Sequence, residues 1–191
     1  STVSANTTSG FSIVSYTGNG IGSATIGTGL GVAPKVVMIK RRSGVDSFPV
    51  WLVGTTQYRV ILNLTNASDT AYPISTSSTI ITTPSTVDSH WNGSGSTYIA
   101  YCFAEKQGYS KFGSYTGGGS NFPFIYTGFK PAWVMIKRTD AAGHYWHIYD
   151  NKRSSSGGSN IIDDVLYPNR SDAEYSGDKL DIISNGIKFR S

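Results

Sequence analysis

The sequence predicts an all-β protein, and three observations lead to that class. Only 15% of the 191 residues are charged, and Glu105 and Glu174 are the only glutamates, so straight-chain helix formers are scarce. Glycine is frequent, with 22 residues, and aromatic residues make up 13% of the chain. Short runs rich in Val, Ile, Thr and Tyr alternate with Gly, Asn, Asp and Ser. We therefore expect an antiparallel β-sandwich, jelly-roll or lectin-like, built from two related repeats.

The strand-like runs follow one another at the spacing typical of a sandwich or barrel. Two of them, residues 36–39 and 133–136, are continuously apolar, which predicts central strands buried on both faces. Asn19 with Gly20 and Asn185 with Gly186 are expected hairpin turns, and a short helical turn is expected at residues 163–164. The expected strands are residues 11–16, 24–30, 35–41, 49–53, 58–64, 79–83, 97–105, 111–116, 123–127, 132–139, 144–150, 161–167 and 180–189, the last broken at Asn185.

Three motifs of the first half return in the second half in the same order. The sequence SYTG at 15–18 returns at 114–117, TG at 28–29 returns at 127–128, and P-x-x-VMIKR at 34–41 returns at 131–138. Trp51 and Trp146 follow that last motif, so both are expected to be structural. We expect a flexible lead-in at 1–9, one repeat at 10–106, and an incomplete repeat at 107–191 that packs with the first as a single unit.

The second repeat has no counterpart of the strand-like run at residues 96–105. We expect either that the gene product continues, or that a neighbouring subunit supplies this strand by strand addition.

No motif in the chain indicates catalysis. His144 and His147 are three apart, which places them on opposite faces of a strand, so a shared metal ion is not expected. The single cysteine, Cys102, lies in an apolar run and is expected to be a buried small hydrophobe. We expect no enzyme, no cofactor and no metal; a polysaccharide-degrading enzyme with two carboxylates brought together by the fold is the alternative.

Two loops combine an aromatic ring with hydrogen-bonding side chains. We expect the loop at 90–95 to expose Trp91, and the loop at 140–147 to lie near a hairpin tip. Sugars present both C–H faces and hydroxyl groups, so such loops suit them; the alternative is that the tryptophans cap the ends of the β-core. The candidate ligand-binding residues are His90, Trp91, Asn92, Asp140, His144 and Tyr145.

Charge and hydropathy exclude two further partners. The net charge is +4, and the densest basic cluster is only residues 40–42, so there is neither a basic stripe nor a nucleic-acid-binding motif. No run approaches eighteen apolar residues, so we expect no membrane span.

Several of these segments resemble an uncharacterised domain family of tailed, often marine, bacteriophages. The resemblance covers most of positions 10–190, and it implies a virion structural or tail-fibre-like protein with no catalytic residues. It also implies a further closing strand after the equivalent of Phe189, which this sequence lacks. The segments that carry it are residues 11–20, 29–35, 37–40, 98–105, 111–117 and 131–138.

Composition, repeat and resemblance together lead to one expected function. We expect a non-enzymatic protein of the virion surface, namely a tail-fibre, head-fibre or capsid-decoration module. It would act with other virion subunits through homo-oligomeric assembly, as a trimer or higher, and would attach to host surface glycans. The alternative is a carbohydrate-binding, lectin-like module.

Overall fold

A computed structural model describes residues 1–54, 57–119, 121–153 and 160–190 of the chain. These residues form an all-β fold of antiparallel sheets, a β-sandwich, and they contain no helix. Accordingly, no helix of the described residues is long and apolar enough to cross a membrane. The strands are β1 (Thr2–Asn6), β2 (Phe11–Thr17), β3 (Thr25–Gly27), β4 (Val36–Arg41), β5 (Pro49–Leu52), β6 (Tyr58–Ile61), β7 (Ser75–Thr76), β8 (Ile80–Thr82), β9 (Thr97–Phe103), β10 (Phe124–Tyr126), β11 (Trp133–Lys137), β12 (Trp146–Asp150), β13 (Ile161–Val165), β14 (Tyr175–Ile183) and β15 (Gly186–Phe189).

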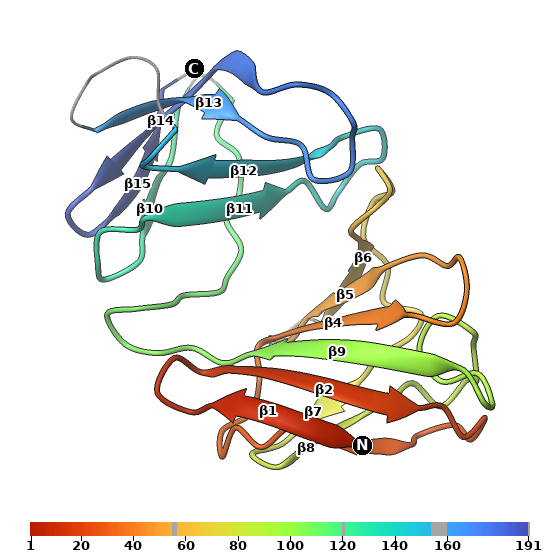
Figure 1. The fold of residues 1–191 in the computed structure, drawn as a ribbon. Coiled ribbons are helices and arrows are strands. Elements are labelled where there is room, and N and C mark those ends of the chain that lie inside the picture. The colour runs from red at the N-terminus through yellow and green to blue at the C-terminus, as the bar shows by residue number, and fades with distance from the viewer. Residues whose placement is uncertain (55–56, 120, 154–159, 191) are drawn as a thin grey trace.

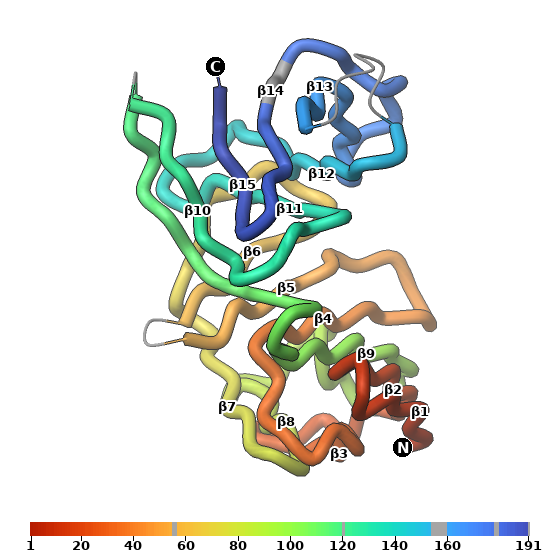
Figure 2. The backbone as a smooth tube through the Cα atoms, turned by 90° about the vertical axis from the view of Figure 1, so that its left-hand side faces the viewer, coloured from red at the N-terminus to blue at the C-terminus, as the bar shows by residue number. Residues whose placement is uncertain are grey.

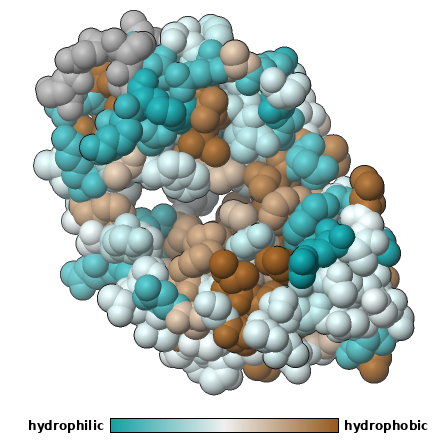
Figure 3. All heavy atoms as spheres, in the orientation of Figure 1, coloured by the Kyte–Doolittle hydropathy of each residue, from teal (hydrophilic) through white to brown (hydrophobic). Residues whose placement is uncertain are grey.

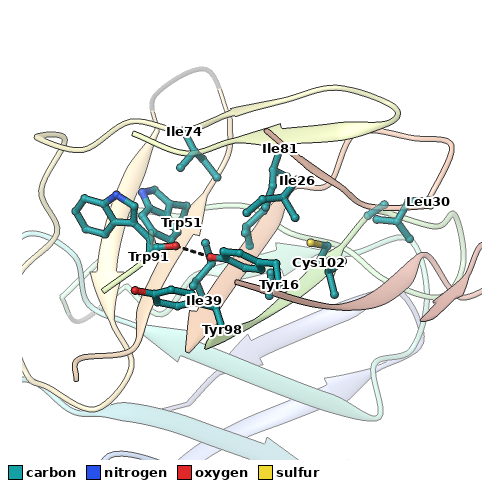
Figure 4. Packing of buried hydrophobic residues seen from close by; sticks show 14 residues of the cluster. Tyr16, Ile26, Leu30, Ile39, Trp51, Ile74, Ile81, Trp91, Tyr98 and Cys102 are labelled. Carbon is teal, nitrogen blue, oxygen red and sulfur yellow. Dashed lines mark hydrogen bonds between the residues drawn. The ribbon is translucent and has the colours of Figure 1, made fainter. Parts of the chain in front are cut away.

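The first half of the molecule, residues 1–103, is a sandwich of two sheets (Figure 1). One sheet has the strand order β1-β2-β9-β4-β5-β6, and the smaller sheet β3-β8-β7 covers one of its faces. In β2 and β9 buried residues alternate with more exposed ones, because successive side chains of a strand point to opposite faces. The buried side chains meet between the two sheets and include Cys102, which confirms its predicted burial (Figure 4).

The second half, residues 124–190, has its own core. The sheet β10-β15-β14-β13 faces the two-stranded sheet β11-β12, as the side view in Figure 2 shows. Between them lie one or more side chains from each of the six strands: Ile125, Val134, Ile136, Tyr149, Ile162, Val165, Leu180, Ile182, Ile187 and Phe189.

A third apolar cluster joins the two halves. The outer face of the large sheet contributes Val36, Val50 and Val60, and the second half contributes Trp146 and Met135. The indole Nε1 of Trp146 also donates a hydrogen bond to the Ile61 carbonyl at 3.0 Å. The prediction that Trp51 and Trp146 are structural is therefore confirmed, since both are buried.

The sequence placed most strands correctly. It missed the two-residue strand β7, and the other exceptions have physical reasons. The expected lead-in is wrong for residues 2–6, which form β1 along β2 although all five are exposed. The expected strand at 111–116 is wrong, because these residues pair with no strand among the described residues. The expected helical turn at residues 163–164 lies in β13. Asn185 does lie in the β14–β15 hairpin turn, whereas Asn19 and Gly20 connect β2 and β3, which belong to different sheets.

The two apolar VMI runs also differ. β4 lies between β9 and β5 and is largely buried, as predicted. β11 pairs with β12 alone among the described residues, so its prediction as a central strand is wrong. The division into repeats at residues 10–106 and 107–191 stays a prediction.

Candidate functional site

The loop at residues 86–96 does not expose its tryptophan. Trp91 has 0% of its surface exposed, packs edge-on against Trp51 at 6.0 Å between ring centroids, and lies 5.2 Å from Tyr72. Its Nε1 donates a hydrogen bond to the Thr86 carbonyl at 3.1 Å. The predicted exposure is therefore wrong, and the indole has no free face against which a ligand can stack.

Asn92 is also buried and is held in the loop by hydrogen bonds. Its Nδ2 donates to Asn19 Oδ1 and to the Ile21 carbonyl, each at 2.7 Å, and its Oδ1 accepts from the Asn19 N–H at 3.2 Å. These contacts tie the loop to the segment after β2, and a buried amide with its hydrogen bonds made in this way acts structurally.

His90 lies between two carboxylates at the end of the large sheet. Its Nε2 is 3.0 Å from Asp46 Oδ1, and its Nδ1 contacts Asp88. Burial raises the pKa of Asp46. The hydrogen bond from Ser89, the electrostatic attraction of His90 and the hydrogen bonds from Arg41 and the Ser47 N–H outweigh burial, so the pKa lies below its ordinary value. This cluster fixes the β4–β5 loop against the 86–96 loop.

The other three candidates lie together at the tip of the β11–β12 hairpin. Arg138 joins two of them, since its Nε is 2.7 Å from Asp140 Oδ1 and its Nη1 is 3.1 Å from His144 Nε2. Tyr145 turns the other way, with its ring 5.5 Å from Tyr167 and beneath the Arg170 guanidinium at 4.4 Å. The hairpin tip is docked on the first half, because the Gly143 N–H donates to the Thr65 carbonyl at 2.9 Å.

The structure therefore divides the six candidates into two groups. His90, Trp91 and Asn92 belong to the first half, and no hydrogen bond or ring contact among the described residues links them to the hairpin tip. Sequence reasoning missed Tyr167 and Arg170, which complete the cluster around Tyr145. They lie more than twenty residues further along the chain, and no spacing pattern indicated the contact.

The free edge of β11 is a further feature of the second half. In the first half β4 pairs with β9 on one side, in the register Val37 to Cys102, and with β5 on the other. Among the described residues β11 has a partner on one side only, the strand β12 that follows it, with Val134 paired to Tyr149. Figure 1 shows the free side of β11 facing the first half, and Figure 3, in the same orientation, shows the surface hollowed between the halves there.

The comparisons with known proteins give a family. The whole chain, residues 1–191, matches the family described as Domain of unknown function (DUF7483). The chain belongs to this family. A search of curated proteins and a search of solved structures found no match.

In this DUF7483 domain two cavities of about 250 Å³ open near the ends of β2. One is polar and is lined by Thr17, Asn19 and Asn92 among others; the second is mainly apolar, with Phe11, Phe103 and Phe112. Neither lining contains an Asp, Glu, His or Cys among the described residues, and these residues contain no group of three such side chains suited to a metal ion. The free edge of β11 is thus the feature with the clearest functional consequence.

Proposed function

We propose that this chain is a non-enzymatic structural or surface module of a virion that works by assembling with copies of itself. The observation that carries the proposal is the free edge of β11. An unpaired edge presents a row of backbone N–H and C=O groups, which is a template for a strand from another chain.

The match between β4 and β11 supports strand addition at this edge. Both strands carry the P-x-x-VMIKR motif, and both pair with the next strand of the chain, β5 or β12. The halves also share a second pairing pattern. In the first half β8 lies between β3 and β7, and in the second half β15 lies between β10 and β14. If the halves correspond in this way, the described residues of the second half contain no strands equivalent to β2 and β9.

Residues 111–116 are consistent with this correspondence. Their counterpart in the repeat lies in β2, and β2 is hydrogen-bonded to β9 along its whole length. Without an equivalent of β9, the segment at 111–116 has no neighbour with which to form a ladder, and this explains why it is not a strand.

Most of the exposed aromatic rings lie in the same half. All the large exposed aromatic side chains of the described residues lie after residue 108, and aromatic residues are enriched at protein interfaces. Phe124, Tyr126, Trp133 and Tyr175 belong to the second half, whereas Tyr109 and Tyr115 lie in the connection between the halves.

The test is the mass of the chain in solution, measured by light scattering or native mass spectrometry. We expect an assembly of three or more chains of 20.5 kDa each. Trp133→Glu places a charge beside the β11 edge, where the indole is 55% exposed, and should weaken self-association about tenfold or more.

Val45→Glu is the matched control, because Val45 is fully exposed on the β4–β5 loop of the first half and its substitution should leave the mass unchanged. A wild-type chain that stays monomeric at all concentrations contradicts the proposal.

A further inference from the structure

The outer face of the β10-β15-β14 sheet carries two exposed aromatic rings in a row. Phe124 and Tyr126 are 45% and 66% exposed, while Ile125 between them packs into the core of the second half. Because they are two residues apart on one strand, the two side chains stand on the same face, roughly 6.6 Å apart along the strand. In Figure 2 the strands β10, β15 and β14 lie next to one another in the second half.

The strand register places polar groups beside the rings. Phe124 is opposite Lys188 of β15, and Lys188 is in turn opposite Asp181 of β14. Tyr126 is opposite Gly186, which has no side chain. A Cβ atom at Gly186 would lie 2.8 Å from Phe124 Cε2, so the phenyl ring leans across β15 at this glycine.

One carboxylate oxygen of Asp181, on this face, accepts no hydrogen bond from the described residues. Its Oδ2 accepts from Arg190 Nε at 2.7 Å, but its Oδ1 is buried and has no hydrogen-bond partner among the described residues. A carboxylate oxygen without a donor is costly in a native structure, and a ligand hydroxyl is a suitable donor. The Arg190 side chain beside it is about half exposed, so it can move to admit one.

We propose that this face is a saccharide-binding platform on which Phe124 and Tyr126 stack against sugar rings. Lys188, Arg190 and Asp181 bond the hydroxyl groups at its border. Sugars combine an apolar C–H face with a rim of hydroxyls, and this combination matches two rings bordered by polar side chains. The platform is separate from the six residues that sequence reasoning selected, and it does not depend on assembly through β11.

The charge of the face favours a saccharide over a nucleic acid. Aromatic stacking on single-stranded nucleic acid is accompanied by a positive groove that follows the phosphates. Here the carboxylate of Asp181 offsets one of the two cations Lys188 and Arg190, and Lys188 Nζ already donates to the Phe122 carbonyl at 2.5 Å. Among the side chains of this face that the structure describes, this leaves one net positive charge, which is too little to follow a phosphate backbone.

The test is affinity electrophoresis of the whole chain in native gels that contain xylan, laminarin, alginate, dextran or bacterial lipopolysaccharide. We expect at least one polysaccharide to retard the wild type, and Tyr126→Ala to weaken that binding about tenfold or more. Tyr109→Ala is the matched control, because Tyr109 is exposed to the same 66% but lies in the connection between the halves. Its retardation should equal that of the wild type.

Folding is controlled separately, because the Phe124 ring contacts the backbone near Gly186 and Phe124→Ala is expected to loosen the sheet. Tyr126→Ala and Asp181→Asn therefore decide the result, with thermal unfolding recorded for each. The proposal is overturned if none of the five polysaccharides retards the wild type, or if Tyr126→Ala and Tyr109→Ala behave alike. It is also overturned if Tyr126→Ala abolishes binding of an oligo-dT strand rather than of a polysaccharide. Trp133→Glu should still be retarded by the same polysaccharide, but more weakly, because dissociated chains lose the avidity of the assembly. Residual retardation in this variant distinguishes failure of assembly from failure of the platform.

Discussion

The carboxylate of Asp46 is held by groups from two loops. It accepts from the Ser47 N–H at 3.2 Å and lies 3.3 Å from Arg41 Nη1, and His90 lies on its other side. These contacts lower its pKa although burial raises it. A carboxyl group with a lowered folded-state pKa stabilises the fold at pH values above its unfolded pKa, and this stabilisation is lost as the pH falls through the folded pKa.

We therefore expect the free energy of unfolding to fall as the pH is lowered from about 5 to about 3, and Asp46→Asn to reduce both the stability at pH 6 and this slope. Urea denaturation at a series of pH values measures both quantities. Asp140→Asn is the control: the pKa of Asp140 is also lowered, mainly by its hydrogen bond to Arg138, but this side chain is exposed and its ion pair is screened. Equal pH profiles for Asp46→Asn and the wild type contradict the prediction.

The burial of Trp91 could not be predicted from its neighbours in the sequence. Its neighbours His90, Asn92 and Gly93 are polar or small, which is typical of an exposed loop. The contacts that bury the indole come from Trp51 and Tyr72, which lie far away in the sequence. The Tyr98 hydroxyl adds to this by donating to the Ser89 carbonyl at 2.6 Å, which folds the loop inward. Only the tertiary structure brings these partners together.

The β14–β15 hairpin depends on close backbone packing at Gly186. A Cβ there would lie 2.2 Å from the Ile125 carbonyl oxygen, which belongs to the neighbouring strand β10. We expect Gly186→Ala to separate β10 from β15 and to lower the free energy of unfolding by roughly 1–3 kcal/mol. Chemical denaturation measures this change.

Gly113→Ala is the matched control for this element. No atom lies within 4 Å of a Cβ built at Gly113, and its backbone is not in the left-handed region. The substitution should leave stability unchanged or raise it slightly, since alanine restricts the unfolded chain. A loss of stability in both variants would show that the close approach at Gly186 is not the cause.

At the scale of elements, the sequence predicts strands that bury one face and misses those that do not. The alternation in β2 and β9 follows from their place in the large sheet. β1 has no buried residue and hence no periodic signal, so the sequence predicts a lead-in there. The segment at 111–116 resembles β2 in sequence but has no strand beside it, and the pairing that a strand needs is not encoded locally.

The repeat pattern suggests that Trp51 and Trp146 are equivalent, but their strand registers differ. Trp51 and Trp146 both follow the VMI strand, but Trp51 pairs with Val37 whereas Trp146 pairs with Lys137. The residue opposite Val134, the counterpart of Val37, is Tyr149. Tyr149 thus takes the core position of Trp51, while Trp146 is placed at the junction of the halves, a position that only the strand register reveals.

Across the whole molecule, this junction decides whether the two halves unfold together. Trp146 is the largest buried side chain in it, and it combines apolar packing on Val36, Val50 and Val60 with the hydrogen bond to the Ile61 carbonyl. The hairpin tip adds further contacts, since the Ser68 N–H donates to the Thr139 carbonyl at 2.8 Å. Each half also has its own core, so the coupling between them rests on these contacts.

We expect the wild type to unfold in one cooperative transition and Trp146→Ala to unfold in two. Truncation of a buried tryptophan costs about 3–5 kcal/mol, and here the loss falls on the contacts between the halves rather than within either core. Differential scanning calorimetry together with tryptophan fluorescence separates the transitions, because Trp51 and Trp91 report on the first half alone. Val45→Ala is the control, since Val45 is fully exposed on the β4–β5 loop and its truncation should preserve the single transition. Two transitions already in the wild type, or one unchanged transition in Trp146→Ala, would show that the junction does not couple the halves.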